Sequence, residues 1–305
     1  PAPVAWADPQ RRSDFDRWLV PLAAQHGLRS ETLRAASADA SFRRYLRIDA
    51  NKGPSLVVMD APPPQEDVRP FVKIAQLIEQ AGLHGPQVLA ADVERGFLLL
   101  TDLGRTLYLD AFADASPKQA DTLMRDAITA LVQWQSKVPG DTLPPYDDAM
   151  LRRELQLFPD WCVARECGVI WGEREQKTWQ QFSDVLVAAA LAQPKVAVHR
   201  DWMPRNLMVS DPNPAILDFQ DAAFGPIAYD VASLLRDAFW SWDEERELDW
   251  AARYWDKARR AALPVGDDFG LVGTRPSAHS SVGDPVSTLT RSPVCRVYLL
   301  HRVQG

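Results

Sequence analysis

Three side chains that carry oxygen ligands are spaced in this sequence as phosphoryl transfer requires. Asp201 ends a His-Arg-Asp triplet, Asn206 follows five residues later, and Asp218 ends a short apolar run twelve residues after Asn206. A carboxylate such as Asp201 can orient an acceptor hydroxyl and take its proton, and the hard oxygen atoms of Asn206 and Asp218 suit Mg²⁺. Asp and Asn are also common in turns. Because the ordered set would rarely arise by chance, it predicts a phosphoryl-transfer site.

The elements around this motif fall into two regions of different kinds. In the first region we predict one helix that begins near Ser13 and ends at Gly27, and another helix that ends at Gly82. Alternating or valine-rich runs predict strands in the same region, at 41–49, 55–60, 87–92 and 96–101. After Gly104 we expect helices at about 117–134, 147–168, 174–193 and 229–262, with short strands at 195–199, 206–209 and 215–218. This order predicts an α+β fold with a β-rich N-lobe, residues 1–103, and a mainly helical C-lobe, residues 104–268.

Charge and composition exclude several classes of protein. The 305 residues carry a net charge of −7, whereas a long nucleic-acid groove shows as a basic excess, so no nucleic-acid partner is expected. No run of about 18 apolar residues is present, so no membrane span is expected. The N-terminal residues show no signal-peptide pattern. Cys162, Cys167 and Cys295 are odd in number and form no CxxC, which favours a reducing cytoplasm over a disulfide framework.

The last part of the chain has a different composition. From Gly270 to Gly305 there is one acidic residue, Asp284, and no lysine, and neither a helical nor a strand period persists. We expect residues 269–305 to be a disordered tail or the product of a shifted reading frame, and the sequence leaves both open.

The segment VHRDWMPRNLM…ILDFQDAAFGPIAYDVASLLRD resembles the aminoglycoside phosphotransferase and choline kinase-like superfamily. Within that superfamily, SADASFRRYLRI, VVMDAPP and FLLLTDLG are similar to the bacterial anomeric sugar kinases that phosphorylate N-acetylmuramate and N-acetylglucosamine in cell-wall recycling. The likeness covers residues 13–268. It implies a protein-kinase-like fold, a nucleotide-binding N-lobe, ATP as co-substrate with Mg²⁺, and a sugar 1-phosphate as product.

The resemblance also implies roles for residues at matching positions. Asp201 is expected to be the catalytic base, Asn206 and Asp218 the magnesium ligands, and Asp230 a structural acid, while His199 is expected to be scaffold. The expected nucleotide-binding residues are Ser41, Arg43, Arg44 and the hinge residues Leu100, Thr101, Asp102 and Leu103. The residues expected near the sugar are Trp202, Arg205, Gln220 and Asp221, with Arg205 either pairing with a lactyl carboxylate or lying at the surface.

Two departures from the wider kinase pattern concern phosphate binding. The chain has no G-x-G-x-x-G, and Met59 stands where a kinase strand carries its phosphate-binding lysine. Methionine cannot neutralise phosphate, whereas arginine is always charged and matches phosphate geometry. Because Arg44 shares a strand face with apolar residues, we expect Arg44 to point toward the phosphates and Arg43 to point outward.

Other functions stay open on the sequence alone. A kinase of an aminoglycoside, choline or an amino-alcohol keeps the fold, although a cationic acceptor would need several acids where Arg205 stands. A pseudokinase would account for Met59 but not for the complete set of Asp201, Asn206 and Asp218. The exact sugar, its anomer and the oligomeric state are not determined.

Overall fold

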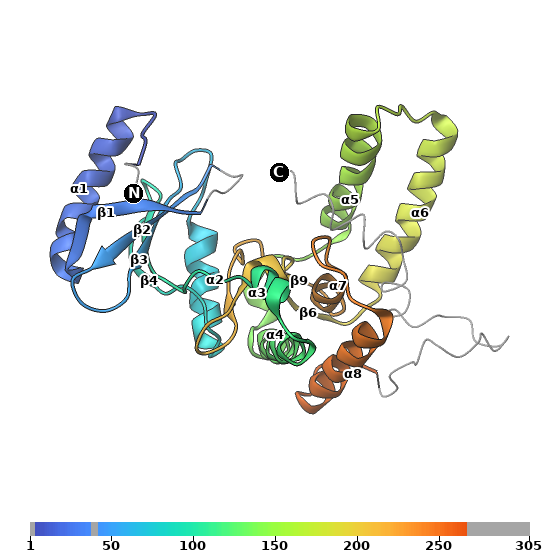
Figure 1. The fold of residues 1–305 in the computed structure, drawn as a ribbon. Helices are drawn as coiled ribbons and strands as arrows, with labels where there is room; N and C mark the ends of the chain where they lie inside the picture. Colours follow the sequence, from blue (N-terminus) through green and yellow to red (C-terminus); the bar gives the residue numbers. More distant parts are fainter. Residues whose placement is uncertain (1–3, 38–41, 267–305) are drawn as a thin grey trace. The chain divides into compact units, whose positions relative to one another are not determined.

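The computed structural model describes residues 4–37 and 42–266, so Ser41 and the segment 269–305 lie outside the described residues. Contacts within the chain divide it into two compact units. The first comprises Pro1–Arg105 and Ala215–Gln220, and the second comprises Thr106–Pro214 and Asp221–Gly305. The first is built on an antiparallel sheet and the second is mainly helical (Figure 1), which confirms the predicted α+β class.

The sheet of the first unit has five strands in the order β1-β2-β3-β5-β4, and every neighbouring pair is antiparallel. The strands are β1 (Leu28–Ser37), β2 (Arg44–Ala50), β3 (Leu56–Asp60), β4 (Val88–Asp92) and β5 (Phe97–Thr101). A turn around Gly53 joins β2 to β3, and the pairing of the two strands places Tyr45 opposite Met59. Since successive side chains alternate along a strand, this register fixes which residues of β2 share a face with Met59.

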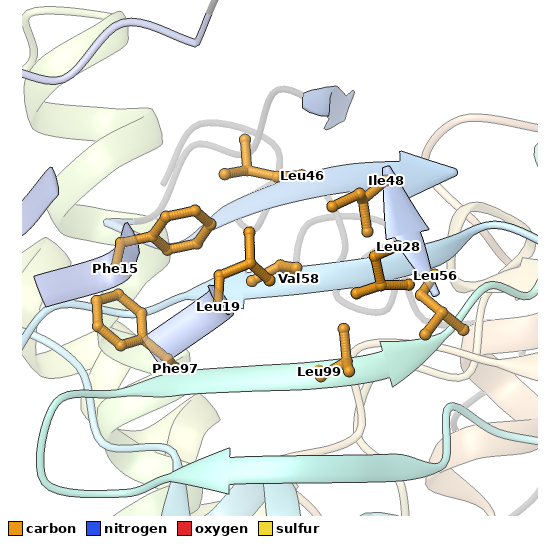
Figure 2. Close-up of a cluster of buried hydrophobic side chains, with 9 residues drawn as sticks. All are labelled: Phe15, Leu19, Leu28, Leu46, Ile48, Leu56, Val58, Phe97 and Leu99. Atoms are coloured by element: carbon orange, nitrogen blue, oxygen red, sulfur yellow. The ribbon is translucent and has the colours of Figure 1, made fainter. Parts of the chain in front are cut away.

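Helix α1 (Pro9–His26) covers one face of the sheet. Phe15 and Leu19 of α1 point onto the strands and pack among buried aliphatic and aromatic side chains (Figure 2). The cluster consists of Phe15, Leu19, Leu28, Leu46, Ile48, Leu56, Val58, Phe97 and Leu99. Burying a large apolar side chain contributes about 1.5–3 kcal/mol, so this cluster is a main source of stability for the first unit.

The buried carboxylate of Asp60 lies at the polar end of the sheet face that α1 covers, where it pairs with two arginines. Asp60, which is 1% exposed, accepts from Nε of Arg11 at 2.9 Å and from Nε of Arg44 at 3.0 Å. The Arg11 guanidinium lies 3.9 Å from the ring centroid of Phe97, and that of Arg44 lies 4.2 Å from the ring centroid of Trp6. Arg44 therefore belongs to the α1 side of the sheet.

The first unit also contains helix α2 (Arg69–Gln80) and a segment from later in the chain. Strand β8 (Ala215–Ile216) reaches this unit through Ile216, whose N–H donates to the carbonyl of His84 at 2.9 Å. Phe219 packs on Phe71 of α2 with ring centroids 4.7 Å apart. The residues on both sides of Asp218 are thus fixed to the first unit.

Among the described residues, the second unit contains seven helices, with short strands between them. The helices are α3 (Tyr108–Asp114), α4 (Pro117–Lys137), α5 (Asp148–Leu157), a π-helix (Phe158–Glu166), α6 (Glu173–Leu191), α7 (Tyr229–Leu235) and α8 (Glu244–Arg260). The 3₁₀ turns Gly140–Thr142 and Pro204–Asn206 and the strands β6 (Lys195–Val198), β7 (Leu207–Met208) and β9 (Ala223–Pro226) complete it. β6 and β9 pair antiparallel, and α5 and α6 lie side by side (Figure 1).

Helix α8 packs on α4 through apolar side chains and a few buried polar contacts. Trp250, 2% exposed, donates its indole N–H to Asp121 at 3.0 Å. The Tyr254 hydroxyl donates to Gln135 at 2.7 Å, and the Gln135 amide donates to the carbonyl of Ile227 at 3.2 Å. Because Trp250, Tyr254 and Gln135 each have a hydrogen-bond partner, α8 is held at a defined register against α4.

The sequence predictions of local structure were wrong or incomplete at several points, including strand β9, which was missed. Strand β1 was not predicted, because its sequence LRSETLRAAS has no apolar alternation. Helix α1 begins before Ser13, because Asp8 is its N-cap and accepts from the Gln10 N–H at 2.8 Å. Helix α3 was missed, and the helix predicted at 229–262 is two helices, α7 and α8.

None of the helices within residues 4–37 and 42–266 combines the length and hydropathy needed to cross a membrane.

The close approach of β9 to Tyr146 generates a stability prediction. A Cβ built on Gly225 would lie 2.5 Å from the Cβ of Tyr146, which is fully buried. We expect Gly225→Ala to lower the free energy of unfolding by about 1–3 kcal/mol, because overpacking forces the backbone or the ring to shift. Chemical denaturation measures this change.

Gly266→Ala is the matched control, because a Cβ on Gly266 would meet nothing within 4 Å. Its effect should stay within about 0.5 kcal/mol. A Gly225→Ala variant as stable as the control would show that β9 and Tyr146 do not pack as described.

Candidate active site

A buried carboxylate fixes the loop that carries the His-Arg-Asp triplet. Asp230, on α7, is fully buried and accepts from the backbone N–H of His199 at 2.7 Å and from that of Arg200 at 3.0 Å. Burial raises the pKa of Asp230 to about 7, and the two amide donors act in the opposite direction. One carboxylate thus holds two successive peptide units, so the path of the chain into Asp201 is set by α7.

The loop between Asp201 and Asn206 is closed by its own hydrogen bonds. The carbonyl of Asp201 accepts from the Met203 N–H at 2.9 Å and from the side-chain amide of Asn206 at 3.1 Å. Asp201 and Asn206 are 2% and 7% exposed. Because the Asn206 nitrogen bonds within the loop, its side-chain oxygen is the atom that can serve as a cation ligand.

His199 and Trp202 are packed inside the second unit. Both are fully buried, and their rings meet edge to face with centroids 5.3 Å apart. The His199 ring also meets Trp134 of α4 edge to face at 6.4 Å, and its Nδ1 accepts from the Asp201 N–H at 3.2 Å. In this structure Trp202 therefore packs against the loop and presents no exposed ring surface for stacking.

Arg200 ties the loop to α5. Its guanidinium forms an ion pair with Glu154, and both side chains are 9% exposed. Glu154 also accepts from the hydroxyl of Tyr146, and Arg200 donates to the carbonyl of Asp221 at 3.1 Å. Burial alone would lower the pKa of Arg200, but the charge of Glu154 and the nearby Tyr146 and Tyr229 outweigh it and raise the pKa.

Two residues of the motif adopt the left-handed backbone region that non-glycine residues rarely occupy. Arg200 has φ 78° and Asp218 has φ 56°. Such conformations cost about 1–3 kcal/mol each and cluster at functional sites. Asp218 is exposed and accepts from the Gln220 side chain at 2.9 Å, and Phe219 beside it is fully buried. The turn therefore presents the Asp218 carboxylate at the surface of the first unit's 215–220 segment.

The remaining residues expected near a sugar lie at the surface of the second unit. Arg205 is exposed, with its guanidinium 5.1 Å from the ring centroid of Phe239. Asp221 is 52% exposed, and its carboxylate lies 3.9 Å from Arg200.

The predicted hinge contains a charge cluster that the sequence did not indicate. Leu100 and Thr101 end β5, and Asp102 and Leu103 follow. Asp102 accepts from Arg47 at 2.6 Å and from the Ser55 hydroxyl at 2.5 Å. Burial raises the pKa of Asp102, but these hydrogen bonds outweigh it and leave the pKa below its usual range. The Asp102 carboxylate, just after β5, therefore holds Arg47 of β2 and Ser55, the residue before β3.

The two candidate phosphate-binding arginines lie on opposite faces of the sheet. Arg44 pairs with Asp60 on the face that α1 covers, whereas Nε of Arg43 donates to Glu66 at 2.7 Å. Arg43 directly precedes β2, so continuing the alternation of that strand puts it on the face of Tyr45 and Met59. The apolar face that Arg44 shares with Leu46 and Ile48 is the one covered by α1, and phosphate binding by either arginine stays a prediction.

Within the described ranges, no cluster of three or more His, Cys, Asp or Glu side chains could hold a metal ion. Magnesium in kinases is held by one or two protein oxygens, and phosphate and water supply its other ligands. The oxygen of Asn206 and the exposed Asp218 carboxylate fit that donor set chemically.

The sequence did not predict the two acids that form ion pairs with Arg200 and Arg43. Glu154 lies on an amphipathic helix, and Glu66 lies in the loop between β3 and α2. Neither residue belongs to a recognisable motif, so only the folded chain identifies it as a partner of Arg200 or Arg43.

The chain is similar to known phosphotransferases and kinases. The pattern of the family described as "Phosphotransferase enzyme family" matches residues 32–268. The N-acetylmuramate/N-acetylglucosamine kinase of Pseudomonas aeruginosa is 55% identical over 234 residues, which cover 77% of this chain and 68% of that protein. The protein of the same name from Pseudomonas putida is 53% identical over 239 residues, covering 78% of this chain and 69% of that protein.

A solved structure supports the fold. The macrolide 2′-phosphotransferase type I matches with a TM-score of 0.60 over 97% of this chain and 90% of its own, at 14% identity. At that identity the likeness shows the fold alone, and it confirms the two-lobed, protein-kinase-like class.

The ion pair between Arg200 and Glu154 generates a prediction. We expect Glu154→Gln to lower the free energy of unfolding by about 3 kcal/mol, because it leaves a buried guanidinium without its counter-charge. Asp148→Asn on the same helix removes an exposed carboxylate and should cost less than about 1 kcal/mol. Denaturant unfolding of both variants checks this, and equal small losses would contradict a buried role for Glu154.

Proposed function

Because the chain belongs to the phosphotransferase enzyme family and is a small-molecule kinase, we propose that it phosphorylates an amino sugar with ATP. The proposed acceptor is N-acetylmuramate or N-acetylglucosamine, and the proposed product is the sugar 1-phosphate. The observation that carries this proposal is the identity of more than half of the aligned residues to two kinases with that name. The proposed setting is peptidoglycan recycling in the cytoplasm, where ATP is available.

In the proposed mechanism, Asp201 is the base that receives the proton of the acceptor hydroxyl. The acceptor oxygen forms a bond to the terminal phosphorus of ATP, the bond from that phosphorus to the bridging oxygen breaks, and ADP leaves. The backbone of Asp201 is held by Asp230 through the preceding residues and by Asn206 through the loop. The base is thus positioned by buried contacts, and positioning is the main contribution a protein makes to phosphoryl transfer.

Magnesium would be held by the side-chain oxygens of Asn206 and Asp218, where it would neutralise phosphate charge. The hydrogen bond from the Asn206 amide to the Asp201 carbonyl, at 3.1 Å, keeps the nitrogen of Asn206 inside the loop and so determines which atom is the ligand. The left-handed turn at Asp218 presents its carboxylate, with Gln220 donating to it at 2.9 Å.

An anomeric hydroxyl suits a carboxylate base. A hemiacetal hydroxyl is more acidic than an ordinary alcohol, so Asp201 need not be a strong base. Arg205 is exposed and is proposed to pair with the lactyl carboxylate of N-acetylmuramate, and Gln220 and Asp221 are proposed to bind sugar hydroxyls. The hinge from Leu100 to Leu103 is proposed to bind adenine through its backbone.

The role of Asp201 generates a kinetic prediction. We expect Asp201→Asn to reduce kcat by about 10²–10⁴, the usual contribution of a positioned base, while ATP affinity stays close to that of the wild type. Asp211→Asn, an exposed acid in the turn after β7, is the control and should leave kcat unchanged. Steady-state ADP release and nucleotide titration measure both quantities. Turnover of Asp201→Asn within a few-fold of the wild type would show that another group is the base.

The site of phosphorylation is a separate prediction. Enzyme, Mg-ATP and N-acetylglucosamine should yield a product whose phosphorus couples to the anomeric proton in phosphorus–proton spectra. The product should also be acid-labile, as a sugar 1-phosphate is. Coupling to the 6-methylene protons would contradict the anomeric assignment while leaving the sugar kinase activity intact.

A further inference from the structure

The strand position where protein kinases carry their phosphate-binding lysine is apolar in this chain. In protein kinases a lysine on the third strand binds the nucleotide phosphates and is held by a glutamate. Met59 occupies β3 here and is 1% exposed. A cation for the phosphates must therefore come from elsewhere on the same face of the sheet.

The pairing of β2 with β3 identifies which side chains share the face of Met59. Tyr45 is the direct partner of Met59, and Arg44 is the partner of Asp60. Arg43 directly precedes the first residue of β2, and continuing the alternation of that strand puts its side chain on the face of Tyr45 and Met59. A long arginine side chain at the end of this face suits the role that a lysine at position 59 has in protein kinases.

Arg43 is held by an acid, as the kinase lysine is. Its Nε donates to Glu66 at 2.7 Å, and the two side chains are 18% and 11% exposed. Burial alone would lower the pKa of Arg43, but the hydrogen bonds and charges of Glu66 and Tyr45 together outweigh it and raise the pKa. Five N–H donors in a planar fork let one guanidinium bind a carboxylate and a phosphate together.

The two arginines of β2 have different tasks. Arg44 is on the α1 face, with Asp60 and Trp6. Arg47, on the face of Met59, binds Asp102 at 2.6 Å and the Gly104 carbonyl at 2.6 Å, and so fixes the strand ends. Because Arg47 is used to hold the strand ends, Arg43 with its acid Glu66 is the candidate for binding phosphate.

We propose that Arg43 binds the terminal phosphates of the nucleoside triphosphate and that Glu66 positions it. The pair has the same two charges as the lysine–glutamate pair of protein kinases, but the cation comes from the residue that directly precedes the neighbouring strand β2. This proposal rests on the proposed kinase function and adds the residue that replaces the missing lysine.

The test compares nucleotide binding in four proteins. The wild type, Arg43→Gln, Arg43→Lys and Arg34→Gln are titrated with Mg-ATP, and KM for ATP is measured separately from KM for the sugar. Loss of a charge-assisted contact should weaken ATP binding of Arg43→Gln by about tenfold or more, with little change in KM for the sugar. Arg43→Lys should retain a substantial part of the affinity. Arg34→Gln, which loses a partly exposed pair with Asp49, should bind ATP as the wild type does.

Further variants separate positioning from folding. Glu66→Gln should raise KM for ATP while thermal unfolding shows a folded protein. Adding Met59→Lys to Arg43→Gln should restore part of the ATP affinity, because it returns a cation to the same face. Equal ATP affinity of the wild type and Arg43→Gln, or a larger loss in Arg44→Gln, would overturn the proposal while leaving the kinase function standing. A wild type that binds no ATP would instead contradict the kinase function itself.

Discussion

The second unit depends on one constraint. Two successive backbone N–H groups donate hydrogen bonds to the carboxylate of Asp230. A fully buried carboxylate is costly unless its oxygens are satisfied, and here each oxygen accepts one N–H, at 2.7 Å and 3.0 Å. The loop cannot move away without leaving that acid without partners, so α7 and the loop move together. The position of Asp201, one residue beyond the second amide, follows from this constraint and not from the chemistry of Asp201 itself.

The same loop contains a backbone conformation that must be stabilised by its surroundings. Arg200 is left-handed, and its side chain reaches Glu154 on α5, where the Tyr146 hydroxyl also bonds. Tyr146 in turn packs against Gly225 of β9. An unfavourable φ costs about 1–3 kcal/mol, and removing one partner of a buried ion pair costs about 3–5 kcal/mol. Helix α5 and strand β9 therefore support the loop through side-chain contacts.

The sequence predicted those parts of the molecule that depend on local pattern. Strands β2 and β3, helix α4 and the α+β class all follow from hydrophobic periodicity. Strand β1 could not be predicted, because the edge strand pairs on one side only and its sequence has no apolar alternation. The orientation of Arg43 and Arg44 could not be predicted either, since alternation separates the two faces but does not say which one α1 covers. The motif acids were evident from spacing, whereas Glu66 and Glu154 are partners brought together only by folding.

The chain is a small-molecule kinase whose motif residues are held by buried acids, and its proposed acceptor is an amino sugar. The most direct test of that proposal is kcat/KM for Mg-ATP-dependent ADP release across N-acetylmuramate, N-acetylglucosamine, choline and an aminoglycoside. We expect one or both N-acetylated sugars to give the highest kcat/KM of the panel. A higher value for choline or the aminoglycoside, or no ADP release with any acceptor by a chain that binds ATP, would contradict it.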